Sequence, residues 1–171
     1  MTSTPPTSPA PTGRLLRTDD GGCDLVLERT FRAPIDDVWA SITESERTAR
    51  WFASWTGEPG AGKTIRYRMT HEGDDAPEGE MTIDACDPPR HLALSAVDDH
   101  GSWLLEATLV EEGGTTVLTF VQHLDDKATP GDTGPGWEYY LDMLVATHTG
   151  GPTPDFDDYY PAQKAYYEGQ A

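Results

Sequence analysis

Hydrophobic and polar residues alternate with a period of two through the middle of the chain. Within residues 63–70, Ile65, Tyr67 and Met69 share one face, and the residues between them are polar. This alternation is typical of a strand with one face in a core and the other in water. Similar segments, separated by turn residues, follow at 79–86, 91–97, 102–111 and 115–123. The pattern predicts an antiparallel meander.

Helical periodicity appears on both sides of this meander. Before it, a β-rich segment at 25–32, with residues 14–18 as a candidate hairpin arm, precedes two short helices predicted at 35–43 and 45–52. After it, a polar connection at 125–135 leads to a strong amphipathic helix that begins at residue 136. This helix should end before Gly150, and its apolar stripe consists of Trp137, Tyr140, Leu141, Leu144, Val145 and His148.

The order of these elements indicates an α+β fold. A sheet with one apolar face needs a cover, and the last helix is the only long one that the sequence predicts, so the sheet should curl around it. The Pro-, Ser- and Thr-rich residues 1–13 are expected to form a disordered tail ahead of a domain at 14–150. Residues 151–171 form an acidic, Tyr-rich extension, and whether it packs on its own domain or on a neighbour stays open.

The formal net charge of −18 over 171 residues narrows the choice of partners. The length suits one domain. Such an acidic surface repels phosphate backbones and anionic lipids, which disfavours nucleic-acid and membrane partners. Solubility or a salty interior explains the charge more simply than a basic partner does. Without a membrane-spanning apolar run or a secretory signal pattern, a cytoplasmic location is expected, as either a monomer or a homodimer.

Several short motifs follow one another from about residue 25 to 148. The opening pattern consists of Arg29, Ala33, Pro34, Val38, Trp39, Thr43, Trp51 and Phe52. It is followed by Gly79, residues 87–89, Gly114 with Thr115, and Gly136 with Trp137, Leu141 and Leu144. In their order and spacing, these motifs resemble those of the START-like superfamily (SRPBCC, with polyketide cyclases and pollen-allergen-like proteins). The branch that the chain resembles is that of the activators of heat-shock protein 90 ATPase.

The resemblance implies a helix-grip fold. In this fold a curved antiparallel sheet wraps around a long C-terminal helix, two short helices follow the first strand, and a cavity lies between the sheet and the last helix. The chain departs from the family at residues 59–63, where Pro-Gly-Ala-Gly-Lys replaces the usual run of an acidic residue, Arg, any residue and two glycines. The role of that arginine therefore cannot be carried over.

Aromatic and methionine side chains that should face the final helix are the candidate ligand-binding residues. Trp and Tyr bring one polar group into an apolar setting, as ligand pockets require. The same residues could equally be ordinary core, and we expect function mainly in the seam between Tyr67, Trp103 and Tyr140. His123 joins the set because it and His148 are the histidines expected to face inward. The candidates are Trp51, Trp55, Tyr67, Met69, Trp103, His123, Trp137, Tyr140 and Leu144.

No catalytic or metal-binding constellation is legible in the sequence. The five histidines form no HxH or HExxH motif, and Cys23 and Cys86 form no CxxC pair, so neither a metal nor a cofactor is expected. A disulfide between the two cysteines has little support in a reducing compartment. Glu80 and Glu106 would matter only if they faced the cavity, and the alternation places Glu80 outward.

Three functions remain as hypotheses. The first is a non-enzymatic domain that binds a hydrophobic or amphipathic small molecule between sheet and helix, with Tyr67, Tyr140 or His123 as polar contacts. The second, implied by the family name, is a regulator that binds a chaperone of the heat-shock protein 90 type. The third is a cyclase or hydrolase in the same cavity, which would need an inward carboxylate or histidine with a displaced pKa.

Overall fold

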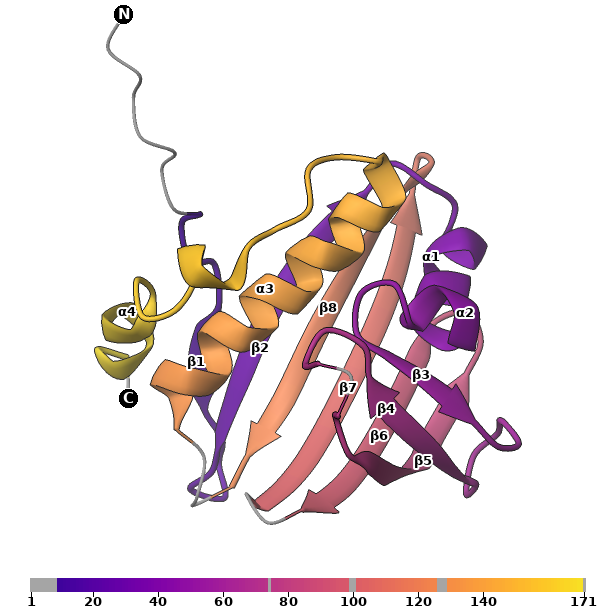
Figure 1. The fold of residues 1–171 in the computed structure, drawn as a ribbon, viewed down its shortest axis with the longest axis horizontal. Coiled ribbons are helices and arrows are strands. Elements are labelled where there is room, and N and C mark those ends of the chain that lie inside the picture. The colour runs from indigo at the N-terminus through magenta and orange to yellow at the C-terminus, as the bar shows by residue number, and fades with distance from the viewer. Residues whose placement is uncertain (1–8, 74, 99–100, 126–128, 171) are drawn as a thin grey trace, which may run out of the picture.

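Eight antiparallel strands form one curved sheet, and the longest helix lies across its concave face (Figure 1). The computed structural model describes residues 9–73, 75–98, 101–125 and 129–170, so residues 1–8 of the predicted tail lie outside the described part. The strands are β1 (Arg14–Arg17), β2 (Cys23–Phe31), β3 (Ala53–Thr56), β4 (Thr64–Met69), β5 (Glu78–Asp87), β6 (His91–Asp98), β7 (Gly101–Glu112) and β8 (Thr115–Leu124). The helices are α1 (Ile35–Thr43), α2 (Ser45–Thr48), α3 (Pro130–Thr149), the 3-10 helix η1 (Phe156–Asp158) and α4 (Lys164–Glu168).

The sheet order is β1-β2-β8-β7-β6-β5-β4-β3. The strands from β3 to β8 follow one another as a meander, and β2 returns beside β8 to join the two ends of the domain. This arrangement confirms the predicted α+β, helix-grip fold with two short helices after an early strand. No helix in the described ranges is both long and apolar enough to cross a membrane.

Three elements differ from the sequence prediction. Helix α3 begins at Pro130 instead of residue 136, so it includes most of the stretch predicted as a polar connection. The second short helix ends at Thr48, and a four-residue strand, β3, follows at Ala53–Thr56. Gly and Pro normally disfavour a helix interior, and the early start of α3 therefore depends on contacts made elsewhere in the fold.

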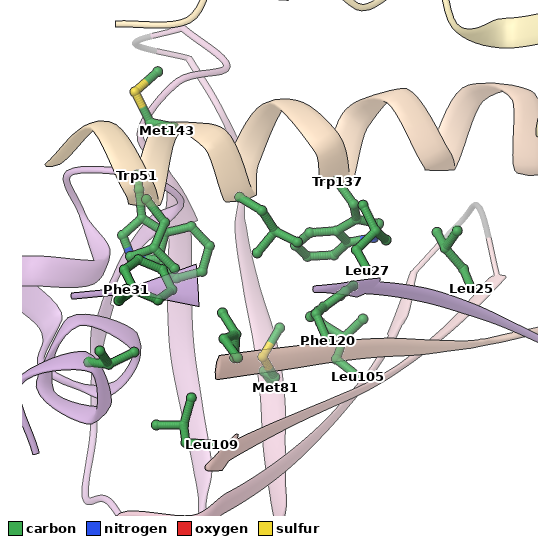
Figure 2. Close-up of a cluster of buried hydrophobic side chains, with 14 of the residues drawn as sticks. Leu25, Leu27, Phe31, Trp51, Met81, Leu105, Leu109, Phe120, Trp137 and Met143 are labelled. Carbon is green, nitrogen blue, oxygen red and sulfur yellow. The ribbon is translucent and has the colours of Figure 1, made fainter. Parts of the chain in front are cut away.

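The hydrophobic core lies between the concave face of the sheet and α3 (Figure 2). Leu27 on β2 and Leu109 on β7 are almost fully buried, as are Leu141 and Leu144 on α3. The ring of Trp137 extends from α3 toward the sheet, and its centroid lies 4.3 Å from that of Phe120. The predicted apolar stripe of the helix therefore supplies the cover that the sheet requires.

Residues 9–13 and the C-terminal extension pack on the outer side of α3. The Gln163 side chain donates a hydrogen bond to the backbone oxygen of Pro9 over 2.9 Å, and Tyr167 is fully buried. Residues 9–13, expected to lie in a disordered tail, thus contact the C-terminal extension. The extension packs on its own domain, which answers the alternative that the sequence left open.

Candidate functional site

An apolar cavity of about 150 Å³ lies between the concave face of the sheet, the α1–α2 corner, strands β3 and β4, and one side of α3. Strand alternation points Leu105 and Ala107 of β7 and Leu118 of β8 into this space. Helix α3 contributes Trp137 and Leu141. Six aromatic rings border the cavity, and they belong to Trp51, Phe52, Trp55, Tyr67, Phe120 and Trp137.

The indole N–H groups around the cavity all donate hydrogen bonds within the protein. Trp51 donates to the backbone oxygen of Ser41 over 2.8 Å, and Trp55 donates to that of Thr43 over 3.0 Å. Trp137 donates to Oε1 of the buried Gln122 over 2.6 Å. These bonds fix the three rings and leave no indole donor for a ligand, so the rings present apolar surface.

Tyr67 differs from the other polar groups that border the cavity. The hydroxyls of Thr43 and Thr48 donate to backbone oxygens of their own helices, over 2.7 and 3.2 Å. The Tyr67 hydroxyl has no hydrogen-bond partner among the described residues, and burial raises the pKa of its phenol. The hydroxyl lies against Gly79, where a Cβ atom would be 2.7 Å from its oxygen, and it is a neutral donor.

Four of the nine predicted ligand-binding residues border this cavity, and five do not. Trp51, Trp55, Tyr67 and Trp137 are the four. Leu144 is fully buried in the core, while Met69 lies on the edge pair β3–β4 opposite Ala53. The remaining three residues, Trp103, Tyr140 and His123, each make a polar contact elsewhere.

Of the predicted seam residues Tyr67, Trp103 and Tyr140, Tyr67 alone borders the cavity. Trp103 pairs with Ala96 where β6 ends and β7 begins, and its indole donates to Asp98 over 2.8 Å. The Tyr140 hydroxyl donates to Glu72 over 2.7 Å, and burial raises the pKa of this phenol. Tyr140 contributes indirectly, because its ring packs against Trp137 with centroids 5.9 Å apart.

His123 does not face inward as predicted. Its strand neighbour Gln122 points to α3, so alternation directs His123 to the convex face of the sheet. There its Nδ1 lies 2.7 Å from Asp24 and its Nε2 lies 2.5 Å from Glu106. Glu106 also accepts from His91 over 2.9 Å, so its carboxylate is engaged outside the cavity. His148 is mostly buried, but it contacts Ser41, away from the cavity.

Several residues that complete the cavity were not predicted as ligand-binding residues. Met81 and Ile83 of β5, Leu94 of β6 and Phe120 of β8 all border it. Each lies on the apolar face of a strand that the sequence predicts, so strand alternation was the signal that could have identified them. Glu106 also borders the chamber, but its carboxylate bonds to His91 and His123 on the convex face. The surface that the described residues present to the chamber is therefore almost entirely apolar.

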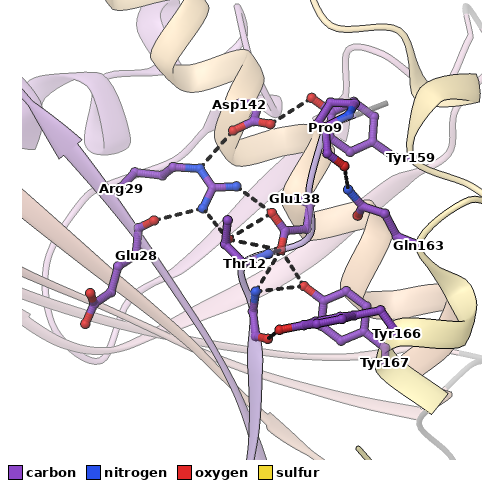
Figure 3. A network of polar contacts seen from close by, with 11 residues as sticks. Pro9, Thr12, Glu28, Arg29, Glu138, Asp142, Tyr159, Gln163, Tyr166 and Tyr167 are labelled. Atoms are coloured by element: carbon purple, nitrogen blue, oxygen red, sulfur yellow. Dashed lines mark hydrogen bonds and ion pairs between the residues drawn. The ribbon is translucent and has the colours of Figure 1, made fainter. Parts of the chain in front are cut away.

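A second feature, on the opposite side of α3, is a buried network of charged groups (Figure 3). Arg29 of β2 contacts Oε2 of Glu138 over 2.7 Å through Nη2 and Oδ1 of Asp142 over 2.9 Å through Nε. The Glu138 side chain is 1% exposed. The backbone N–H groups of Thr12 and Gly13 donate to its Oε1 over 2.5 and 2.8 Å.

The network keeps Glu138 ionised. Burial by itself raises the pKa of this carboxyl, but the hydrogen bonds from Tyr167 and Thr12 and the charge of Arg29 outweigh burial and lower it. Tyr159 donates to the other oxygen of Asp142 over 2.7 Å. The sequence motif included Arg29, but its partners on α3, and the tyrosines of the extension that bond to those partners, were not predicted.

The family model described as Activator of Hsp90 ATPase homolog 1-like protein matches residues 32–149, well over half of the chain. The chain belongs to this family. The match confirms the resemblance drawn from the motifs between about residues 25 and 148. A comparison with curated proteins found no match.

Solved structures share the fold of this family member. CalU16 from Micromonospora echinospora is 23% identical with a TM-score of 0.74, and the match covers 94% of this chain and 96% of that one. The protein encoded by gene BPP1335 of Bordetella parapertussis is 25% identical with a TM-score of 0.73, covering 100% and 96%. DynU16, from the dynemicin biosynthetic locus, is 20% identical with a TM-score of 0.65, covering 78% and 50%.

Proposed function

We propose that this protein binds a small, uncharged, largely apolar molecule in the cavity between the sheet and α3. The observation that carries the proposal is the chamber of six aromatic rings whose indole donors are already bonded within the protein. A molecule that enters such a chamber loses its water and gains contacts with apolar rings, without competing for the indole N–H groups.

The size and polarity of the cavity support one class of ligand. An apolar cavity of about 150 Å³ stays dry and holds benzene in a well-studied engineered case. The present cavity has the same volume, so we infer that its ligand inserts a single ring of about that size. The unpartnered Tyr67 hydroxyl fits one polar substituent on that ring. A larger amphipathic molecule would keep its remaining part outside.

Iodobenzene provides a direct test, because its heavy atom quenches the fluorescence of tryptophans that it contacts. Three tryptophans border the cavity, so saturable quenching that benzene reverses by competition is the expected result. The Ala107→Phe variant fills the chamber and should abolish quenching. Ala93→Phe is the matched control, since Ala93 lies between Leu92 and Leu94 and faces the convex side. Absence of saturable quenching in the unaltered protein would rule out the proposal.

Phenol tests the part assigned to Tyr67. In the Tyr67→Phe variant phenol should bind about five- to tenfold more weakly, the loss expected for one hydrogen bond, while benzene binding stays unchanged. An equal effect on both probes would show that the hydroxyl does not contact the ligand.

The family description names the Hsp90 ATPase, but no contact among the described residues favours a chaperone function over ligand binding.

A further inference from the structure

The first two turns of α3 have a sequence that is poorly suited to a helix. Residues 130–136 read Pro-Gly-Asp-Thr-Gly-Pro-Gly, with Pro135 inside the helix. Gly and Pro are the two residues that least favour a helix interior, and Pro135 also lacks a backbone N–H. This segment therefore needs tertiary contacts to remain helical, unlike the apolar half of α3 that follows it.

The C-terminal residues 156–170, which we call the clasp, supply those contacts. The ring of Tyr167 lies so close to Gly134 that a Cβ atom there would be 2.5 Å from it. A Cβ atom at Gly131 would be 2.8 Å from the Glu168 side chain. The glycines that weaken the helix are thus what allows the clasp to approach it.

Polar contacts join the clasp to the same segment and to the N-terminal residues. The Tyr167 hydroxyl donates to Oε1 of Glu138 over 2.5 Å, and Lys164 lies 3.5 Å from Asp132. The Tyr166 hydroxyl donates to the backbone oxygen of Gly13 over 2.9 Å. Within the clasp Tyr159, Gln163 and Tyr167 are buried, and the other residues are half-buried or exposed.

The segment under the clasp leads directly into a wall of the cavity. Glu138 faces the clasp, while the preceding residue, Trp137, borders the cavity on the other side of the helix (Figures 2 and 3). Trp137 and Leu141 form the α3 side of the cavity, so movement of the segment that precedes them would change the width of the chamber. The Gly- and Pro-rich stretch of α3 ends directly before Trp137.

We propose that the clasp regulates entry to the cavity. While it is docked, it keeps residues 130–137 helical and Trp137 in place. When it is released, this segment loosens and the wall at Trp137 opens. The ligand-exchange part of this inference rests on the proposed function, whereas the effect on the helix does not.

Two alanine substitutions in α3 distinguish the effect of the clasp on the helix from the effect of helix propensity. Gly134→Ala displaces Tyr167, while at Gly136 a Cβ atom meets nothing within 4 Å. Both changes favour a helix by a similar amount, about fivefold in the local equilibrium. We expect amide hydrogen exchange in residues 130–137 to become about tenfold faster in Gly134→Ala and slower in Gly136→Ala. Unchanged or slower exchange in Gly134→Ala would overturn the proposal.

Stopped-flow quenching by iodobenzene tests the consequence for the cavity. Entry should be faster in Gly134→Ala and in a chain ending at Gly151, and slower in Gly136→Ala. Exchange protection in β7 and β8 checks that each variant retains its sheet. Faster helix exchange without faster entry would overturn regulation by the clasp. If iodobenzene binds no variant, the proposed function fails, and hydrogen exchange alone then decides whether the clasp stabilises the segment.

Discussion

The hydroxyl of Tyr167 donates a hydrogen bond to the buried carboxylate of Glu138 over 2.5 Å, which links α4 to the middle of α3. Glu138 accepts further bonds from the backbone of Thr12 and Gly13 and pairs with Arg29. One side chain of α3 thus joins β2, the N-terminal residues and the C-terminal extension. None of these groups borders the cavity, so replacing them should alter stability without removing a cavity-lining side chain.

Replacing Tyr167 by Phe removes a donor to a buried, ionised carboxylate. A hydrogen bond to a charged group contributes about 1.5–3 kcal/mol, so the free energy of unfolding should fall by about that amount. Tyr166→Phe is the control, because its hydroxyl donates to a neutral backbone oxygen from a more exposed position and should cost about 1 kcal/mol or less. Urea unfolding measures both. Equal losses would show that the charge of Glu138 adds nothing to the bond.

Replacing Arg29 by Met leaves Glu138 buried beside Asp142 with no cation. Breaking a buried ion pair on one side costs about 3–5 kcal/mol, because an uncompensated charge remains. Adding Glu138→Leu should recover part of that loss, so the double variant should be more stable than the sum of the single effects predicts. Chemical denaturation of the three variants gives the coupling free energy. Strict additivity would contradict the assigned pairing.

The sequence specified the sheet well because each strand keeps one apolar face. Alternation placed the strands from β4 to β8 within one or two residues of their observed bounds. It failed for the first part of α3, where propensity argues against a helix and the decisive contacts come from Tyr167, more than 30 residues away in the sequence. Local sequence patterns cannot predict a helical segment that residues distant in the sequence stabilise.

The candidate site was predicted in part for a related reason. Trp51, Tyr67 and Trp137 could be assigned to the interior from their periodicity, and all three border the cavity. His123 was wrongly assigned to the interior. Side chains alternate along β8, so Gln122 points inward to Trp137 and His123 points outward to Asp24. The burial of Glu138 could not be read from an apolar stripe, since it depends on the extension that covers the polar side of α3.

Gln122 should be needed for the position of Trp137. Replacing it by Leu leaves the buried indole N–H without its acceptor, which costs about 1–3 kcal/mol. If the bond is the reason for the cost, Gln122→Leu should be much less destabilising in a Trp137→Phe background. Thermal unfolding of the unaltered protein, the two single variants and the double variant completes this double-mutant cycle. A cost that is the same in both backgrounds would show that Gln122 acts through packing alone.

The carboxylate–histidine network on the convex face should make stability depend on pH. Burial lowers the pKa of His123, but bonds to Glu106 and Asp24 outweigh this and raise it above its ordinary 6.5. Its stabilisation is therefore complete below about pH 6.5 and is lost as pH rises through the higher folded value.

For Glu106 the dependence on pH has the opposite sign. Bonds from His123 and His91 lower the pKa of Glu106 below 4.5, so its stabilisation is present above that pH and is lost as pH falls through the folded value. The advantage of the unaltered protein over His123→Gln should therefore be largest between about pH 5 and 6.5 and smaller at pH 3 and pH 9. Because these side chains are about one-third exposed, water screens them, and the effect should be about 1 kcal/mol, or about 2–4 °C in Tm. A melting-temperature difference that does not vary with pH would show that His123 is not the titrating group.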